Sequence, residues 1–311
     1  MDEKNKTYYY SFSEYLRQRF GVRVHRISIN AGFSCPNRDG TLSDQGCIFC
    51  NEEGFSHYTG VYPSIEEQIA TSMGFIRERF KAEKFIAYFQ NASNTYADVD
   101  TLRQTYDVIK KFPDIVGLTI STRPDCIDKA KLDLIDTYAG AYDVWIEYGL
   151  QSIHEKTLKT INRLHSTMQF LEAIEQTAKR RIKIGVHVIL GLPGESKEEI
   201  METADVLSTL PIDGVKLHVL HVLRDTKLQE QYKEGKIQLL ESDEYVQLAC
   251  DFLERLSPKC VVMRLVSDAN KDVLIAPEWI NQKHKVRQDI EDEFQKRGTR
   301  QGCRGGPRVR P

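Results

Sequence analysis

Three cysteines near the start of the chain have the residue type and spacing of a metal centre. Cys47 and Cys50 form a CxxC pair, and Cys35 lies upstream of them in a glycine-bearing loop. Thiolate sulfur is a ligand of zinc and of iron–sulfur clusters. No fourth cysteine lies nearby, although His57 could act as a further ligand. Three protein ligands leave one coordination position open for a substrate, as in catalytic sites. A zinc site and unliganded reduced thiols stay as alternatives.

This loop resembles the cluster loop of radical S-adenosylmethionine (SAM) enzymes, because an aromatic residue, Phe49, directly precedes the last cysteine. The resemblance implies that Cys35, Cys47 and Cys50 hold a [4Fe–4S] cluster, with SAM on its open iron and Phe49 near the adenine. The commonest spacing in that superfamily is CxxxCxxC, so the long gap after Cys35 is a departure. A long first gap occurs in the branch that contains the Elongator catalytic subunit and the YhcC/YtqA-type proteins.

Composition limits the classes of protein to which the chain can belong. Its 311 residues suffice for one large α/β barrel or two modest domains. The net charge of −2 provides no general attraction for nucleic acid, so such a contact needs a local basic patch. The sequence shows no apolar run long enough to span a bilayer. Seven cysteines without a disulfide pattern favour a reducing cytoplasm, which also suits an iron–sulfur centre.

Apolar runs alternate with amphipathic segments along most of the chain. The runs predict strands at 25–30, 84–90, 115–121, 144–150, 184–190 and 214–222. A strand followed by a helix, about six times over, predicts a parallel sheet in an α/β protein. The expected fold is a partial (β/α)6 TIM-type barrel of the radical SAM core with a C-terminal α/β extension.

Changes in this pattern predict four regions. They are an N-terminal helical segment (1–23), the partial-barrel core (24–223), a C-terminal extension (224–297) and a basic tail (298–311). The tail is rich in glycine, proline and arginine, a composition typical of disorder.

Polar or glycine-bearing segments follow the predicted strands, where the chemistry of such barrels collects. The resemblance implies cofactor contacts from Phe49, Asn91, Ser93, Glu147, Gln151, Arg163, Gly191 and Glu195. Arg163 would pair with the SAM carboxylate. Leu164 stands where the related Asn-Arg-Gly-His element has glycine, and Asn91-Ala-Ser93 departs from the usual Gly-Gly-Glu. Glu147 could instead be a structural carboxylate, Arg163 a surface residue and His187 a core histidine.

The resemblance is closest to the YhcC/YtqA-type radical SAM proteins, including the MnmL enzymes that mature the tRNA wobble uridine. It implies reductive cleavage of SAM to a 5′-deoxyadenosyl radical and conversion of a carboxymethylaminomethyl group to an aminomethyl group. It also implies an electron donor of the flavodoxin or ferredoxin type. The predicted tRNA contacts are Lys283, Lys285 and Arg287. The alternatives are a radical SAM dehydrogenase acting on a small molecule and a non-enzymatic zinc or iron–sulfur RNA-binding module. The residue that completes the substrate chemistry is not identified by the sequence.

Overall fold

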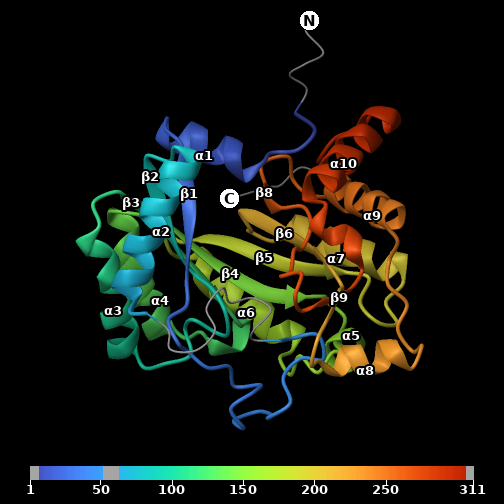
Figure 1. Ribbon diagram of the computed structural model, residues 1–311, viewed down its shortest axis with the longest axis horizontal. Coiled ribbons are helices and arrows are strands. Elements are labelled where there is room, and N and C mark those ends of the chain that lie inside the picture. The colour runs from blue at the N-terminus through green and yellow to red at the C-terminus, as the bar shows by residue number, and fades with distance from the viewer. Residues whose placement is uncertain (1–6, 52–62, 306–311) are drawn as a thin grey trace, which may run out of the picture.

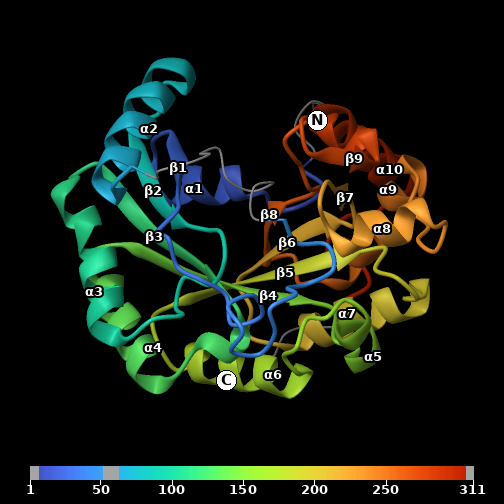
Figure 2. The same cartoon turned by 60° about the horizontal axis from the view of Figure 1, so that its bottom comes forward.

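A computed structural model describes residues 7–51 and 63–305 of the chain (Figure 1). Seven parallel strands form one sheet in the order β1-β2-β3-β4-β5-β6-β8. They are β1 (Val24–Ile29), β2 (Lys84–Phe89), β3 (Ile115–Thr122), β4 (Asp143–Gln151), β5 (Lys183–Leu190), β6 (Gly214–Val219) and β8 (Val261–Arg264). The sheet curls into an open half-barrel (Figure 2), which confirms the predicted partial barrel.

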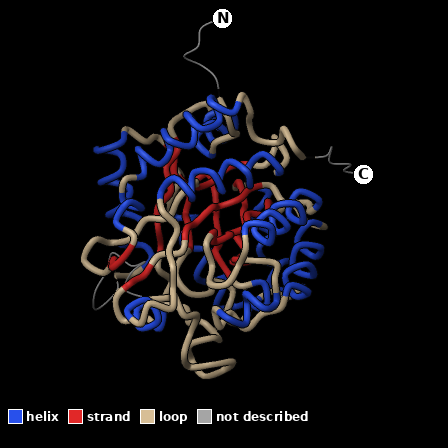
Figure 3. Tube along the Cα trace, turned by 90° about the vertical axis from the view of Figure 1, so that its right-hand side faces the viewer, coloured by secondary structure: helices blue, strands red, loops and turns tan. Residues whose placement is uncertain are grey.

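Helices surround the strands (Figure 3). They are α1 (Phe12–Phe20), α2 (Ile65–Phe80), α3 (Val99–Asp107), α4 (Lys129–Asp136), α5 (Glu155–Thr160), α6 (Thr167–Ala178), α7 (Lys197–Thr209), α8 (Lys227–Lys233), α9 (Ser242–Arg255) and α10 (Lys283–Arg297). Capping boxes open α2 at Ser64 and α7 at Ser196, as their sequences predict. Each buries one apolar face, and most helical stability in a globular protein comes from such a face.

Apolar side chains also close the N-terminal end of the half-barrel. Val24, Trp145 and Met263 pack together there, and Phe12 of α1 covers them. Trp145 is fully buried and meets the Phe12 ring edge to face, with the ring centroids 6.2 Å apart. This packing holds α1 against the N-terminal ends of the strands.

The seventh strand comes from the C-terminal extension. Six strands were expected in the barrel, but β8 pairs in parallel with β6 and enlarges the sheet by one. A separate two-stranded ladder joins β7 (Val222–Leu223) to β9 (Leu274–Ala276). Tyr10 and Ser11 cover part of the β8 edge, where the Val262 amide donates to the Tyr10 carbonyl at 2.7 Å. The extension is thus part of the barrel wall.

The described part of the C-terminal tail is folded against the barrel. Gln301 is buried, and its side-chain amide donates to the carbonyls of Ser257 and Cys260, each at 2.7 Å. The side-chain oxygen of Gln301 accepts a hydrogen bond from the Tyr10 backbone amide at 2.8 Å. The prediction of a disordered tail is therefore wrong for residues 298–305, because one buried glutamine satisfies several backbone groups. Within the described residues, no helix is both long and apolar enough to cross a membrane.

Candidate active site

The loop of residues 30–51, here called the cysteine loop, follows β1 at the C-terminal edge of the sheet (Figure 1). It is held by the segment 161–163. The Asn37 side chain donates to the Asn162 carbonyl at 2.6 Å, and the Asn162 side chain donates to the Gly46 carbonyl at 2.7 Å. The Ile48 amide donates to the Ile161 carbonyl at 3.1 Å. Two segments far apart in sequence therefore fix the positions of the cysteines.

The three predicted ligands lie close enough to interact. Burial, together with the neighbouring Cys47 and Cys35, raises the pKa of the Cys50 thiol to about 12. Cys47 is buried, and its sulfur accepts weak hydrogen bonds from Asn37 Nδ2 at 3.5 Å and Arg163 Nη1 at 3.6 Å. Donors to sulfur stabilise the thiolate, which is the form that binds metals.

Buried guanidinium groups surround these thiols. Arg123 forms a bidentate pair with Asp125, at 2.9 and 2.8 Å, and it interacts electrostatically with Cys35 and Cys47. Arg123 Nη1 and Arg163 Nε are buried, and neither has a hydrogen-bond partner among the described residues. Unsatisfied buried donors are costly, so an anionic group is expected beside them.

These observations fit a [4Fe–4S] cluster. The donor set is thiolate, and its surroundings are positively charged. Within residues 7–51 and 63–305, no three His, Cys, Asp or Glu side chains converge as ligands of a single ion. A cluster does not require such convergence, because each thiolate binds its own iron. His57, the further ligand considered for zinc, lies outside the described residues.

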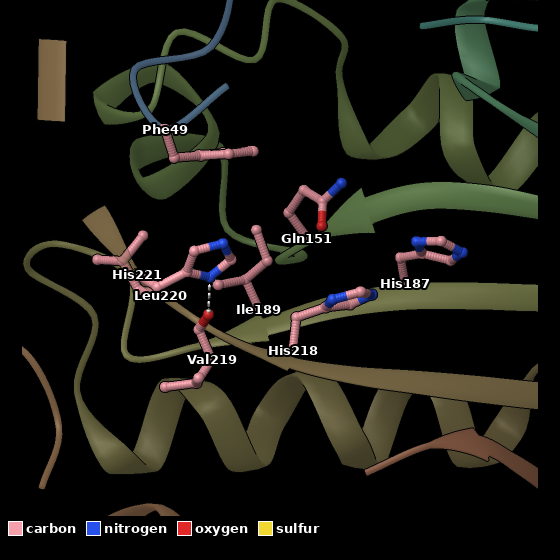
Figure 4. A pocket seen from close by; sticks show the side chains of 8 residues that line it. All are labelled: Phe49, Gln151, His187, Ile189, His218, Val219, Leu220 and His221. Atoms are coloured by element: carbon pink, nitrogen blue, oxygen red, sulfur yellow. Dashed lines mark hydrogen bonds between the residues drawn. The ribbon is translucent and has the colours of Figure 1, made fainter. Parts of the chain in front are cut away.

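A pocket of about 140 Å³ adjoins the cysteine loop (Figure 4). The predicted Phe49 and Gln151 meet here, with Ile189, His187, His218 and the segment 219–221 completing the lining. Gln151 has a φ of +76° where β4 ends, which turns the chain at the pocket. His218 and His221 would point to opposite faces of a continuous strand, but β6 ends at Val219, and both line the pocket. The apolar walls suit a planar ring.

Gly191 and Glu195 of the fifth-strand motif shape the rim of the site. Gly191 has a φ of +82°, and a Cβ there would lie 2.8 Å from Leu240 Cδ1, so glycine is required. Ser152 donates a hydrogen bond to Glu195, and burial raises the pKa of this carboxyl group. Glu195 thus links the ends of β4 and β5, and a cofactor contact from either residue stays a prediction.

The loop after β2 braces the cysteine loop. The Ser93 amide donates to the Ser34 carbonyl at 3.2 Å, and the Ser93 hydroxyl lies 2.9 Å from the Thr122 hydroxyl. Asn91 has a φ of +71°, a left-handed conformation that asparagine tolerates. The hydroxyl of Ser93 is thus engaged within the protein.

Arg163 bridges the cysteine loop and β4. Its Nη2 donates to the Gly149 carbonyl at 2.7 Å, while Nη1 contacts Cys47. It is buried, so it is not an ordinary surface arginine. A Cβ at position 149 would lie 2.7 Å from Arg163 Nη2, and glycine therefore admits the guanidinium. The predicted SAM carboxylate contact of Arg163 is not tested by these contacts.

Glu147 lies deeper, on the inner face of β4. It is fully buried; Oε2 accepts from Lys216 Nζ and lies 2.9 Å from His187 Nε2. Lys216 also donates to the Tyr88 hydroxyl at 2.9 Å. Burial lowers the pKa of Lys216 to about 7. Burial opposes the ionisation of Glu147, but Lys216, His187 and Arg26 together outweigh it and keep the pKa of Glu147 below its usual range. Glu147, Lys216 and His187 therefore form a buried polar layer, in which Glu147 and Lys216 are the ion pair.

A second cavity runs along the open side of the half-barrel. This open groove has a volume of about 1260 Å³, and its lining includes Arg26, Tyr88, Arg264, Lys283 and Arg287. Sequence reasoning did not single out Arg26 or Arg264. The sequence feature that could have identified them is an arginine whose side chain points to the inside of the barrel. Which face of a strand points inward becomes known only when the direction in which the sheet curls is known.

The predicted tRNA-binding residues lie on the first turns of α10. Each of them is exposed, but each has an acidic partner: Lys283 pairs with Asp268, Lys285 with Asp289 at 3.1 Å, and Arg287 with Glu291 at 2.9 Å. Lys283 and Arg287 also line the open groove. The acidic partners reduce the net positive charge that this surface presents.

Comparisons with known proteins agree with this geometry. The radical SAM superfamily profile matches residues 35–207, and the radical SAM C-terminal domain profile matches residues 212–296. YtqA of Bacillus subtilis (strain 168) is 37% identical over 298 residues, covering 94% of this chain and 92% of the relative. YhcC of Escherichia coli (strain K12) is 33% identical and covers 95% of both chains.

More distant similarity extends to two proteins with larger chains. The tRNA uridine(34) acetyltransferase of Dehalococcoides mccartyi (strain CBDB1) is 27% identical over 58% of this chain and 39% of its own length. The solved structure of archaeal Elp3 from Methanocaldococcus infernus aligns with a TM-score of 0.67 at 16% identity. That alignment covers 90% of this chain and 64% of the Elp3 chain, and it shows a shared fold.

Proposed function

This chain belongs to the radical SAM superfamily, in a branch with YtqA and YhcC, and on that premise we propose that it modifies the wobble uridine of tRNA. The proposed reaction converts a carboxymethylaminomethyl side chain into an aminomethyl side chain. Enzymes of this superfamily use a [4Fe–4S] cluster and SAM. A reducing donor of the flavodoxin or ferredoxin type would supply the electron.

The residues of the site divide the work. Cys35, Cys47 and Cys50 would hold the cluster, and the pocket beside Phe49 would take the adenine of SAM. When bound, the cluster and SAM supply a reductive cleavage that yields a radical able to remove hydrogen from an unactivated carbon. Arg163 and Arg123, which are both buried, hold positive charge beside the thiolates.

The open groove is the feature of the structure that best supports tRNA as the substrate. Its volume of about 1260 Å³ exceeds the roughly 300–1,000 Å³ usual for small-ligand pockets. A side opening lets a single nucleotide enter while it stays joined to its polymer, whereas a closed pocket admits only free molecules. Unstacked bases in RNA loops are the usual targets of sequence-specific recognition. The tRNA uridine named in the distant relative supports the same class of substrate.

The test is mass spectrometry of tRNA nucleosides from cells that lack this gene. We expect loss of aminomethyl-derived wobble uridines and accumulation of the carboxymethylaminomethyl form. Complementation with the wild-type gene should restore the profile, whereas the Cys47→Ser variant should not. An unchanged nucleoside profile rejects the tRNA proposal and favours a radical SAM dehydrogenase acting on a small molecule.

A further inference from the structure

We propose that Arg26, which lines the open groove, and Glu147, which is fully buried on β4, together bind an N-substituted glycine, in which one methylene joins an amine to a carboxylate. The Arg26 guanidinium would bind the carboxylate, and the Glu147 carboxylate would bind the amine. This inference rests on the proposed function, because a carboxymethylaminomethyl side chain carries this group.

Arg26 is a cation that forms no hydrogen bond or ion pair through its Nη1 atom among the described residues. Its guanidinium lies over two rings, 4.9 Å from the Phe12 centroid and 5.6 Å from the Tyr88 centroid, which hold its plane. Its Nη1 atom is buried and has no hydrogen-bond partner in the described part of the chain. Arginine keeps its charge even when burial lowers its pKa, and an unpaired buried charge is costly. An anion from outside would remove that cost.

The nearby carboxylates are already engaged by other cations. Glu147 binds Lys216, and Asp268 binds Arg264 at 3.2 Å as well as Lys283. Glu147 provides the largest electrostatic attraction on Arg26, yet the two side chains form no hydrogen bond or ion pair. Arg26 thus lies near a carboxylate whose charge is neutralised by Lys216.

Glu147 has a buried acceptor oxygen that lacks a hydrogen-bond donor, just as Arg26 has a buried donor that lacks an acceptor. Oε2 contacts both Lys216 and His187, whereas Oε1 is buried and receives no hydrogen bond within residues 7–51 and 63–305. An amine on the ligand would donate to Oε1, while its carboxylate would accept from Arg26. Because such a ligand is zwitterionic, it satisfies both groups without changing the net charge of the layer. A simple anion would bind Arg26 but would leave Glu147 Oε1 without a hydrogen-bond donor.

The methionine end of SAM also carries an amine and a carboxylate, so the experiment must separate the two sources. We propose to measure binding of two free nucleosides, 5-carboxymethylaminomethyluridine and 5-aminomethyluridine, to cluster-loaded protein saturated with SAM. Both nucleosides carry the amine, but the second lacks the carboxylate. Wild-type protein should bind the first more tightly. Arg26→Gln should weaken binding of the first by about 10- to 100-fold and leave the second unchanged, as expected for a lost charged hydrogen bond.

Three further variants sharpen the test. Arg26→Lys keeps the charge and should restore part of the affinity, which separates a charge effect from misfolding. Glu147→Gln should weaken both nucleosides, since both carry the amine. Arg103→Gln, which removes an exposed arginine of α3, should change neither.

Several results would overturn the inference. One is equal or undetectable binding of the two nucleosides by the wild-type protein. Another is an equal effect, or no effect, of Arg26→Gln on the two nucleosides. A third is a drop in SAM affinity in Arg26→Gln with the nucleoside preference unchanged, which would assign the site to SAM. A different result would refute the proposed function alone. In that case, the tRNA of cells that lack the gene would be unchanged, while the protein would still prefer 5-carboxymethylaminomethyluridine in a manner that depends on Arg26.

Discussion

At the scale of single residues, the inner layer of the half-barrel combines charge with burial. His187 stacks on His218, with ring centroids 5.1 Å apart, and it contacts Glu147. Desolvation disfavours the protonated imidazole, so burial lowers the pKa of His187 to about 4 and lowers that of His218 as well. Both rings are thus expected to be neutral where the protein works.

The first prediction is that His187 stays neutral in the folded protein down to about pH 4. The unfolded chain would protonate it near pH 6.5, so its contribution to the free energy of unfolding is complete above pH 6.5. This contribution is lost as the pH falls toward 4, at up to about 1.4 kcal/mol per pH unit. Histidine NMR titration, with a His187→Gln variant to assign the signal, measures the pKa. A midpoint near 6.5 would contradict the prediction.

At the scale of elements, the segment 161–165 carries strain in order to hold the cysteine loop. Asn162 and Leu164 have φ values of +53° and +58°, in the left-handed region. The sequence showed that Leu164 replaces a glycine, and the backbone keeps the conformation that glycine would adopt. Leu164 is 42% exposed, so its side chain contributes little packing to offset this conformation.

The second prediction concerns this position. Leu164→Gly should raise the free energy of unfolding by about 1 kcal/mol, because left-handed backbone costs a non-glycine residue roughly 1–2 kcal/mol. Greater flexibility of the unfolded chain offsets part of the gain. Thermal denaturation under anaerobic conditions measures the effect. The matched control is Gly149→Ala, which should destabilise the protein, since its Cβ would collide with Arg163. A destabilised Leu164→Gly protein would show that this leucine is needed for packing.

The sequence predicted local features better than remote pairings. The alternation around Ile27 and Ile29 is local, and it located β1. By contrast, Glu147 and Lys216 are separated by 69 positions, and nothing in either segment indicates their contact. Arg26 was missed for the same reason, because its inward direction depends on how the whole sheet curls.

At the scale of the whole molecule, the cysteines divide into those of the cysteine loop and those elsewhere. Cys250 and Cys260 are buried in the core, and Cys303 is exposed in the tail. Cys126 is buried after β3; burial raises the pKa of its thiol, and Cys35 raises it too, so Cys126 lies near the cysteine loop.

The third prediction is that anaerobic reconstitution gives brown protein with about four irons, the number in a [4Fe–4S] cluster. Combined Ser replacement of Cys35, Cys47 and Cys50 should abolish the colour, because the thiolate ligands are lost. Iron analysis and visible absorbance measure the outcome. Cys303→Ser is the control and should retain full iron. Stoichiometric zinc in place of iron, in protein kept free of oxygen, would refute the cluster assignment.

The fourth prediction concerns the surface of α10. Neutralising Lys283, Lys285 and Arg287 together should weaken tRNA binding and reduce its dependence on salt concentration, because each phosphate contact releases counterions. The loss should stay modest, because acidic partners already offset these charges. Binding at several salt concentrations measures the slope. Lys179→Gln, at the C-terminal cap of α6, is the control, and an equal effect there would indicate nonspecific attraction.

The hydrogen bonds that join the cysteine loop to the segment 161–163 have a consequence for biosynthesis. Arg163 lies about 113 residues after Cys50 in the sequence, so the ribosome synthesises it later. At about 5–20 residues per second, the thiols spend roughly 6 to 23 s in the nascent chain without their anchor. During this interval the cysteines are open to oxidation, and an inserted cluster would lack its supporting arginine. Cluster delivery is therefore expected to follow synthesis of the fourth strand, and oxygen exposure during translation should cost more active protein than exposure afterwards.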